Sequence, residues 1–118
     1  MELNIGIKDE QKEFLNQTTT DFSLSGIEET IQLLVKEMLN KFDNQIVFGE
    51  VRCVGECFSN DEFLKVKLDE KDIAKMKDIF LQYDFEEYDS EEEELSKVIR
   101  CIIIFADQEC DLNKIFLN

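Results

Sequence analysis

The sequence predicts an α+β fold, a single two-layer domain built mainly from an antiparallel sheet with two helices. Three observations support this: alternating apolar and polar residues near both residue 5 and residue 65, two stretches with apolar residues at helical spacing, and a nearly continuous apolar run after residue 97. The 118 residues fit one domain, residues 1–118, and an apolar fraction of 43% is enough to form a core.

The first predicted strand covers Met1 to Lys8, where Leu3, Ile5 and Ile7 alternate with more polar residues. This period of two is typical of a half-buried strand. The following segment, residues 9–24, combines apolar residues that need burial with a polar, β-branched stretch at 17–20. Its pattern is compatible with a loop or with a second strand.

The clearest predicted helix begins at Ser25. The sequence Ser25-Gly26-Ile27-Glu28 matches a capping box, in which the serine hydroxyl and the glutamate carboxylate accept hydrogen bonds from unpaired backbone N–H groups. One apolar stripe follows at helical spacing and predicts a helix that ends near residues 43–44. The stripe consists of Ile27, Ile31, Leu34, Val35, Met38 and Phe42.

A hairpin and a second helix are predicted next. Residues 45–58 are rich in Ile, Val, Phe and Cys and predict a strand with two apolar faces, while 59–61 favour a turn. Residues 63–68 alternate again, so the two runs predict a hairpin. Asp69 is suited to cap a helix whose inner face carries Ile73, Met76, Phe80 and Tyr83.

The last predicted strand, Val98 to Phe105, is the most apolar run of the chain and is expected at the centre of the sheet. The tail, residues 107–118, keeps enough apolar residues to dock on the body. The resulting order is strand, helix, strand, strand, helix, strand, as in ferredoxin-like folds. An antiparallel sheet with helices on one face and another strand order fits nearly as well.

The charge balance restricts the partners. Thirteen basic residues face twenty-eight acidic ones, a formal net charge of −15. Nucleic acid and anionic membranes are therefore not expected as direct ligands, because binding them requires Lys and Arg. A basic protein is the expected partner. The N-terminus shows no signal peptide, and no apolar run approaches the roughly 20 residues that span a bilayer, so a cytoplasmic location is expected.

Catalysis has no support in the sequence. The chain contains no histidine, which removes the most common general base and the usual nucleophile pairs, and it has no Gly-rich phosphate-binding loop. Glu50 and Glu56, flanked by apolar residues, are the best candidates for carboxylate chemistry, although outward-facing carboxylates explain them as well. We therefore expect a protein that is not an enzyme and binds no cofactor.

The four cysteines raise the question of a zinc site. Cys53 and Cys57 have a C-x3-C spacing, and Cys101 and Cys110 could complete a four-thiolate set. However, the first pair lies in a predicted strand rather than on a tight knuckle, and eight residues separate the second pair. Packing of reduced thiols in the core is the expected role, and no metal is predicted.

An acidic run at residues 84–94 is the sharpest functional feature. It is predicted to be a loop, because its charges repel one another, although residues 91–95 could start a short helix. Its carboxylates, together with two aromatic residues among them, could form an electrostatic docking surface for a basic partner. The alternative is a solvated loop that maintains solubility. A calcium site is not expected, because the alternating pattern and glycine of calcium loops are missing. The candidate partner-binding residues are Asp84, Phe85, Glu86, Glu87, Tyr88, Asp89, Glu91, Glu92, Glu93 and Glu94.

Three binding functions are compatible with these features. The first is an inhibitor or immunity-type protein that neutralises a basic partner, most plausibly a bacterial nuclease toxin. The second is a phage-type antidefence protein that mimics DNA and blocks a host nuclease or a CRISPR effector. The third is a non-catalytic, dimerising regulatory subunit, with 115–117 and the apolar strands as its interface. The sequence leaves the oligomeric state open.

Overall fold

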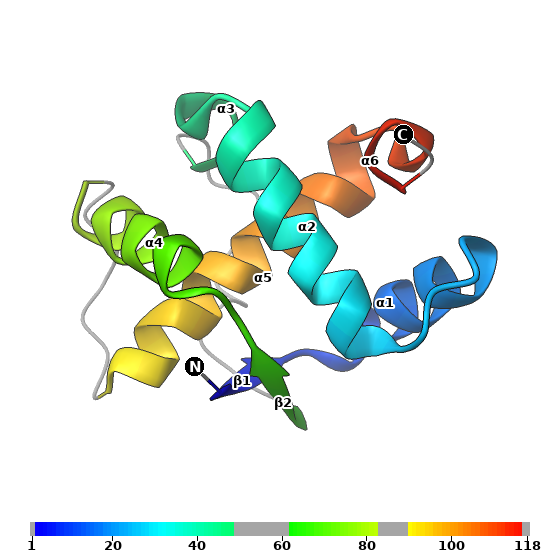
Figure 1. Ribbon diagram of the computed structural model, residues 1–118, viewed down its shortest axis with the longest axis horizontal. Coiled ribbons are helices and arrows are strands. Elements are labelled where there is room, and N and C mark those ends of the chain that lie inside the picture. The colour runs from blue at the N-terminus through cyan, green and yellow to red at the C-terminus, as the bar shows by residue number, and fades with distance from the viewer. Residues whose placement is uncertain (1, 49–61, 83–89, 117–118) are drawn as a thin grey trace.

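The computed structural model describes residues 2–48, 62–82 and 90–116, and it is mainly helical (Figure 1). Among these residues six helices and two strands follow one another along the chain. They are β1 (Glu2–Ile7), α1 (Asp9–Asp21), α2 (Ile27–Lys41), α3 (Asn44–Phe48), β2 (Glu62–Lys67), α4 (Glu70–Gln82), α5 (Glu91–Glu109) and α6 (Leu112–Phe116).

Two helices, α2 and α5, cross at the centre of the molecule, and the other elements pack around them (Figure 1). Helix α5 contacts β1, α1, α3 and α4, whereas α2 contacts β2, α1, α4 and α6. Ile31, Leu34 and Met38 of α2 and Ile99 and Ile102 of α5 are at most 1% exposed. The contact between these two apolar stripes therefore forms the core that positions the surface elements.

The predicted mainly antiparallel sheet with two helices is wrong. The described residues contain only a two-stranded sheet, and residues 98–105, expected as its central strand, belong to α5. Burial along α5 recurs with the period of a helix, because Leu95, Val98, Ile102 and Phe105 are all buried. A short apolar run does not distinguish a buried strand from a buried helix. Here a 19-residue helix with a capped N-terminus contains the run.

Strand β1 was predicted correctly, and in the structure it lies beside β2. β1 pairs with β2 in antiparallel register, with Ile5 opposite Leu64 and Leu3 opposite Val66. The predicted alternation holds in both strands, since Leu3, Ile5, Ile7 and Val66 are buried. The strand predicted for 45–58 begins instead with the short helix α3, and residues 49–58 lie outside the described residues.

Side chains of α5 bond the edge of β1 that faces away from β2. The Asn4 N–H donates to Glu92 Oε2 at 2.6 Å, and the Gly6 N–H donates to Ser96 Oγ at 3.0 Å. Arg100 Nη1 donates to the Gly6 carbonyl oxygen at 2.8 Å. These three residues lie four apart on α5, so they follow one face of the helix along the strand.

Helix α1 occupies the segment whose pattern was compatible with a loop or a strand. Its threonines are accommodated because their hydroxyls bond carbonyls one turn back, from Thr18 to Phe14 and from Thr19 to Leu15. Thr19 Oγ1 also lies 2.6 Å from Oγ1 of Thr30, which is fully buried on α2. This polar contact joins α1 to α2 inside the apolar core.

The capping box predicted at Ser25 forms differently. The N-cap residue of α2 is Gly26, and the Ser25 hydroxyl donates to Glu29, not to Glu28. Glu28 instead accepts from the Lys67 N–H of β2 at 2.9 Å. Helix α4 begins directly after Asp69, as predicted, and its predicted inner residue Tyr83 lies outside the described residues.

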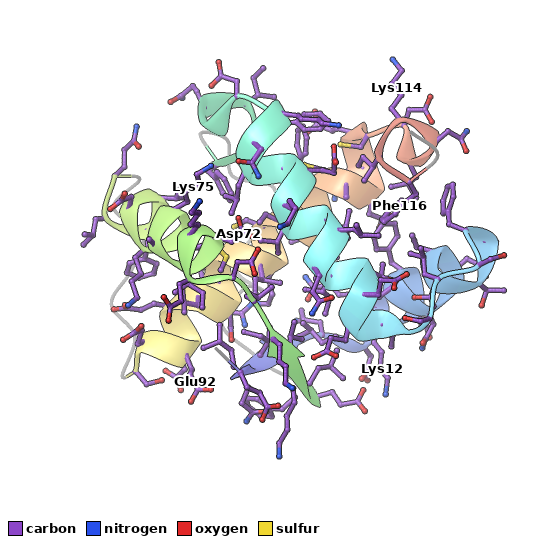
Figure 2. The ribbon with its side chains drawn as sticks, in the orientation of Figure 1. Lys12, Asp72, Lys75, Glu92, Lys114 and Phe116 are labelled. Atoms are coloured by element: carbon purple, nitrogen blue, oxygen red, sulfur yellow. The ribbon has the colours of Figure 1, made fainter. Side chains whose placement is uncertain are left out.

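The C-terminal tail docks on the body, as the sequence predicted. Ile115 of α6 is buried, and the Phe116 ring lies 5.1 Å from the Phe22 ring, which follows α1 (Figure 2). Both apolar residues therefore contribute to the internal packing. Within the part of the chain that the structure describes, no helix has the length and apolar character needed to cross a membrane.

Candidate functional site

Only part of the acidic run at 84–94, the predicted docking surface, lies among the described residues. Asp84, Phe85, Glu86, Glu87, Tyr88 and Asp89 lie outside the described residues. The remaining four candidates lie in the first turn of α5, so a helix starts at residue 91, the alternative to a loop, and it is long rather than short. They are Glu91, Glu92, Glu93 and Glu94. Ser90 is the N-cap, and its hydroxyl accepts from the Glu93 N–H at 3.2 Å. Carboxylates stabilise a helix N-terminus, because they oppose the partial positive charge of its free N–H groups.

Glu91 and Glu92 hold elements of the fold together. Glu91 pairs with Lys77 of α4, and Glu92 accepts from the backbone of β1 (Figure 2). Glu94 lines a cavity of about 210 Å³ between α4 and α5, together with Phe80 and Leu81. Leu81 is 79% exposed. The first turn of α5 therefore combines anchoring of the fold with an acidic surface beside an exposed apolar residue.

A larger cavity, about 510 Å³, opens between α2 and α4 at the end of β2. Volumes of this size are typical of ligand-binding pockets. Six of its eight lining residues are polar or charged, with three carboxylates and two lysines among them. The lining residues are Glu29, Gln32, Leu33 and Lys36 of α2, Lys67 and Leu68, Asp69, and Asp72 of α4. We call this cavity the α2–α4 pocket.

Asp72 is unlike the other described carboxylates. It is 6% exposed, whereas every other Asp and Glu among the described residues is exposed or half-buried. Figure 2 shows it between α4 and α2. No residue in the described part of the chain hydrogen-bonds its side chain, yet its oxygens are not sealed from solvent. The carboxylate therefore offers acceptor positions to whatever enters the α2–α4 pocket.

Four other polar side chains of the pocket have hydrogen-bond partners. Gln32 donates to the Lys67 carbonyl oxygen at 2.7 Å, and Glu29 accepts from Ser25. Lys36 Nζ donates to Asp69 Oδ2 at 2.8 Å. This hydrogen bond and charge lower the pKa of Asp69 and raise the pKa of Lys36, to which the charge of Asp72 adds.

Metal binding finds no support in the described residues. There, no group of three or more His, Cys, Asp or Glu side chains is arranged to hold an ion. Cys101 on α5 and Cys110 at its end are half-buried and pack against the core. Cys53 and Cys57, and also Glu50 and Glu56, lie outside the described residues.

The sequence reasoning missed Asp72, although a signal was present. Asp72 precedes the buried Met76 by four residues, so it lies on the face of α4 that packs inward. An acidic residue on an apolar helical face indicates either a buried partner or a binding site. Lys36, Glu29 and Asp69 gave no such signal, because their positions on the helix surfaces are ordinary for charged residues.

Comparisons with known proteins gave no match for this chain. No protein-family model matches the chain, and no similar curated protein or solved structure was found.

Proposed function

We propose that this chain is a small acidic inhibitor or immunity-type protein that binds and neutralises a basic partner protein, most plausibly a bacterial nuclease toxin. One observation carries the proposal. Twenty of the twenty-one carboxylates among the described residues lie at the surface, exposed or half-buried, in a chain with a net charge of −15.

The cations offset less than half of this charge, since thirteen Lys and Arg face twenty-eight Asp and Glu. Lys12, Lys36, Lys41 and Lys77 are each paired with a carboxylate, and Arg100 is buried on α5. The negative potential is therefore left to act on other molecules. Such a field attracts a partner with a Lys- and Arg-lined cleft, which nucleases need for their own substrate, and it raises the association rate.

The test is capture followed by reconstitution. The immobilised chain is exposed to a lysate of the source cells and eluted with rising salt, and the retained basic protein is then purified separately. We expect it to bind the chain with an affinity that falls steeply with salt, and to lose its nuclease activity when the chain is added in equal amount. Retention without inhibition, or an empty column at low salt, would contradict the proposal.

Charge variants localise the contact. The first variant combines Glu91→Gln, Glu93→Gln and Glu94→Gln and so removes three charges from the first turn of α5. Glu92 is kept because it accepts the hydrogen bond from the Asn4 N–H. The matched control, Glu10→Gln, Asp78→Asn, Asp107→Asn, removes three exposed charges from scattered positions. If the α5 turn contacts the partner, the first variant weakens binding more than the control. Equal effects would place the contact elsewhere on the acidic surface.

A DNA-mimicking antidefence protein would use the same electrostatics. The identity of the captured protein separates the two functions, because a toxin and a defence nuclease differ in sequence and substrate.

A further inference from the structure

Asp72 of the α2–α4 pocket is a carboxylate held in an unusual state. It is 6% exposed and accepts no hydrogen bond from the described residues. Its oxygens are not sealed from solvent, so they remain able to accept hydrogen bonds from a group that enters the pocket. Lys36, on the facing helix, does not hydrogen-bond Asp72, since its Nζ donates to Asp69 at 2.8 Å. A cation that donates hydrogen bonds to Asp72 would supply what the fold does not.

The charge of the pocket selects the class of ligand. Three carboxylates, from Glu29, Asp69 and Asp72, face two lysines. An anion would meet a net negative surface, and one of the two lysines is already paired with Asp69. The ligand that complements the pocket is therefore positively charged.

The lining further favours a guanidinium over an ammonium group. A guanidinium is planar, presents several N–H donors in a fixed fork, and binds a carboxylate through two parallel hydrogen bonds. It is also less strongly hydrated than an ammonium ion, so entering a recess costs it less. Leu33 and Leu68 line the same pocket and can contact the aliphatic part of a long side chain.

We infer that the α2–α4 pocket receives an arginine side chain of the partner protein, with Asp72 as the acceptor of its guanidinium. This inference rests on the proposed function, since it identifies the group that the basic partner inserts. Arginines seated in recessed, desolvated sites are frequent hot spots of protein interfaces. The exposed glutamates would then steer the partner, while Asp72 would provide the specific contact.

The first experiment uses a small probe and needs no partner. N-acetyl-arginine methylamide is titrated into the ¹⁵N-labelled chain at about 0.15 M salt, where the screening length is about 8 Å. We expect shift changes confined to residues 29–36 and 67–73, and weaker binding of the matching lysine probe. Changes spread evenly over the acidic surface, the turn at 91–94 included, would overturn the inference.

Variants then separate Asp72 from general charge. Asp72→Asn, nearly identical in shape, should weaken binding of the arginine probe by about tenfold or more, equivalent to 1.4 kcal/mol. Asp78→Asn removes one charge from an exposed position of the same helix and should leave binding unchanged. Leu33→Trp, which fills the pocket without a change of charge, should also abolish the local shifts. Unchanged binding by Asp72→Asn or Leu33→Trp would overturn the inference.

The outcomes for the pocket and for the proposed function are distinguishable. A partner captured equally well by the wild-type chain and by Asp72→Asn would refute the pocket inference and leave the inhibitor function standing. Local binding of the arginine probe without any basic partner in the lysate would support the pocket and refute the inhibitor function.

Discussion

Ser96 of α5 accepts a hydrogen bond from the buried N–H of Gly6 at 3.0 Å, and its hydroxyl in turn donates to the Glu92 carbonyl oxygen at 2.7 Å. The helix therefore takes the position that a third strand would occupy beside β1. Glu92 and Arg100, one turn before and one turn after, complete the contact.

Ser96→Ala is expected to lower the free energy of unfolding by about 1–3 kcal/mol, because it leaves the buried Gly6 N–H without an acceptor. Urea unfolding measures the change. The control is Ser25→Ala, which removes an exposed hydroxyl bonded to Glu29 and should shift the free energy by about 0.5 kcal/mol or less. Similar effects of the two substitutions would show that the contact between Ser96 and Gly6 contributes nothing specific.

Ile102→Ala is expected to cost about 2–5 kcal/mol, since Ile102 is fully buried and the substitution leaves a cavity. Ile104→Ala should cost clearly less, because Ile104 is half-buried on α5. In a strand the two residues would share one face, and their substitutions would cost equally. Equal losses of unfolding free energy would thus argue for the strand that the sequence predicted.

Ser90→Ala is expected to lower stability by about 1 kcal/mol, because Ser90 caps α5 through the Glu93 N–H. Ser90→Thr keeps a hydroxyl at the cap and should recover most of the loss. The check is the urea midpoint, together with amide exchange in the first turn of α5. A Thr variant as unstable as the Ala variant would indicate that the hydroxyl is not the source of the effect.

The ion pair of Lys36 and Asp69 predicts a small dependence of stability on pH. The pKa of Asp69 is lowered by the hydrogen bond and charge of Lys36, so its contribution is present above the ordinary value of about 3.8 and is lost as the pH falls through the lowered value. The pKa of Lys36 is raised mainly by its hydrogen bond to Asp69, so its contribution is present below about 10.5 and is lost as the pH rises through the raised value.

Unfolding of wild type and Lys36→Met across pH measures this contribution. The difference between them should be modest at neutral pH, vanish in acid once Asp69 is protonated, and shrink at about 1 M salt, because both groups are exposed to solvent. Lys65→Met, at an exposed position of β2, serves as the control. A difference that persists in acid would show that Lys36 acts through packing of its methylene groups.

Elements that bury a single face could be predicted from the sequence, because their apolar residues recur with a clear period. The alternation of Leu3, Ile5 and Ile7 identified β1, and the stripe from Ile31 to Met38 identified α2. The prediction for α5 was wrong because this helix is buried on several faces. Ile102, Ile103 and Phe105 are all buried, so the sequence shows a continuous apolar run like that of a central strand. Helix α1 was missed because threonines have a low helix propensity. In the structure, hydrogen bonds of their hydroxyls to carbonyl oxygens one turn back and to Thr30 of α2 offset this propensity.

The candidate site was predicted only in part. The carboxylates of Glu91 to Glu94 are conspicuous in the sequence, but their bonds to Lys77 and Asn4 depend on α4 and β1 being brought to the same helix turn. The α2–α4 pocket requires the crossing of two helices that are separated by 28 residues of chain between Lys41 and Glu70. Such long-range placement is not encoded in any local pattern.

The bonding of α5 along β1 has a consequence for how copies of this chain can associate. Repeated addition of strands into a fibre needs two open sheet edges per molecule, one to accept the preceding copy and one to offer to the next. The side chains of Glu92, Ser96 and Arg100 occupy one of these edges. Along β2, the N–H and carbonyl of Lys67 are likewise bonded by side chains of α2, Glu28 and Gln32. Helix side chains therefore hinder the addition of further strands on both sides of this sheet.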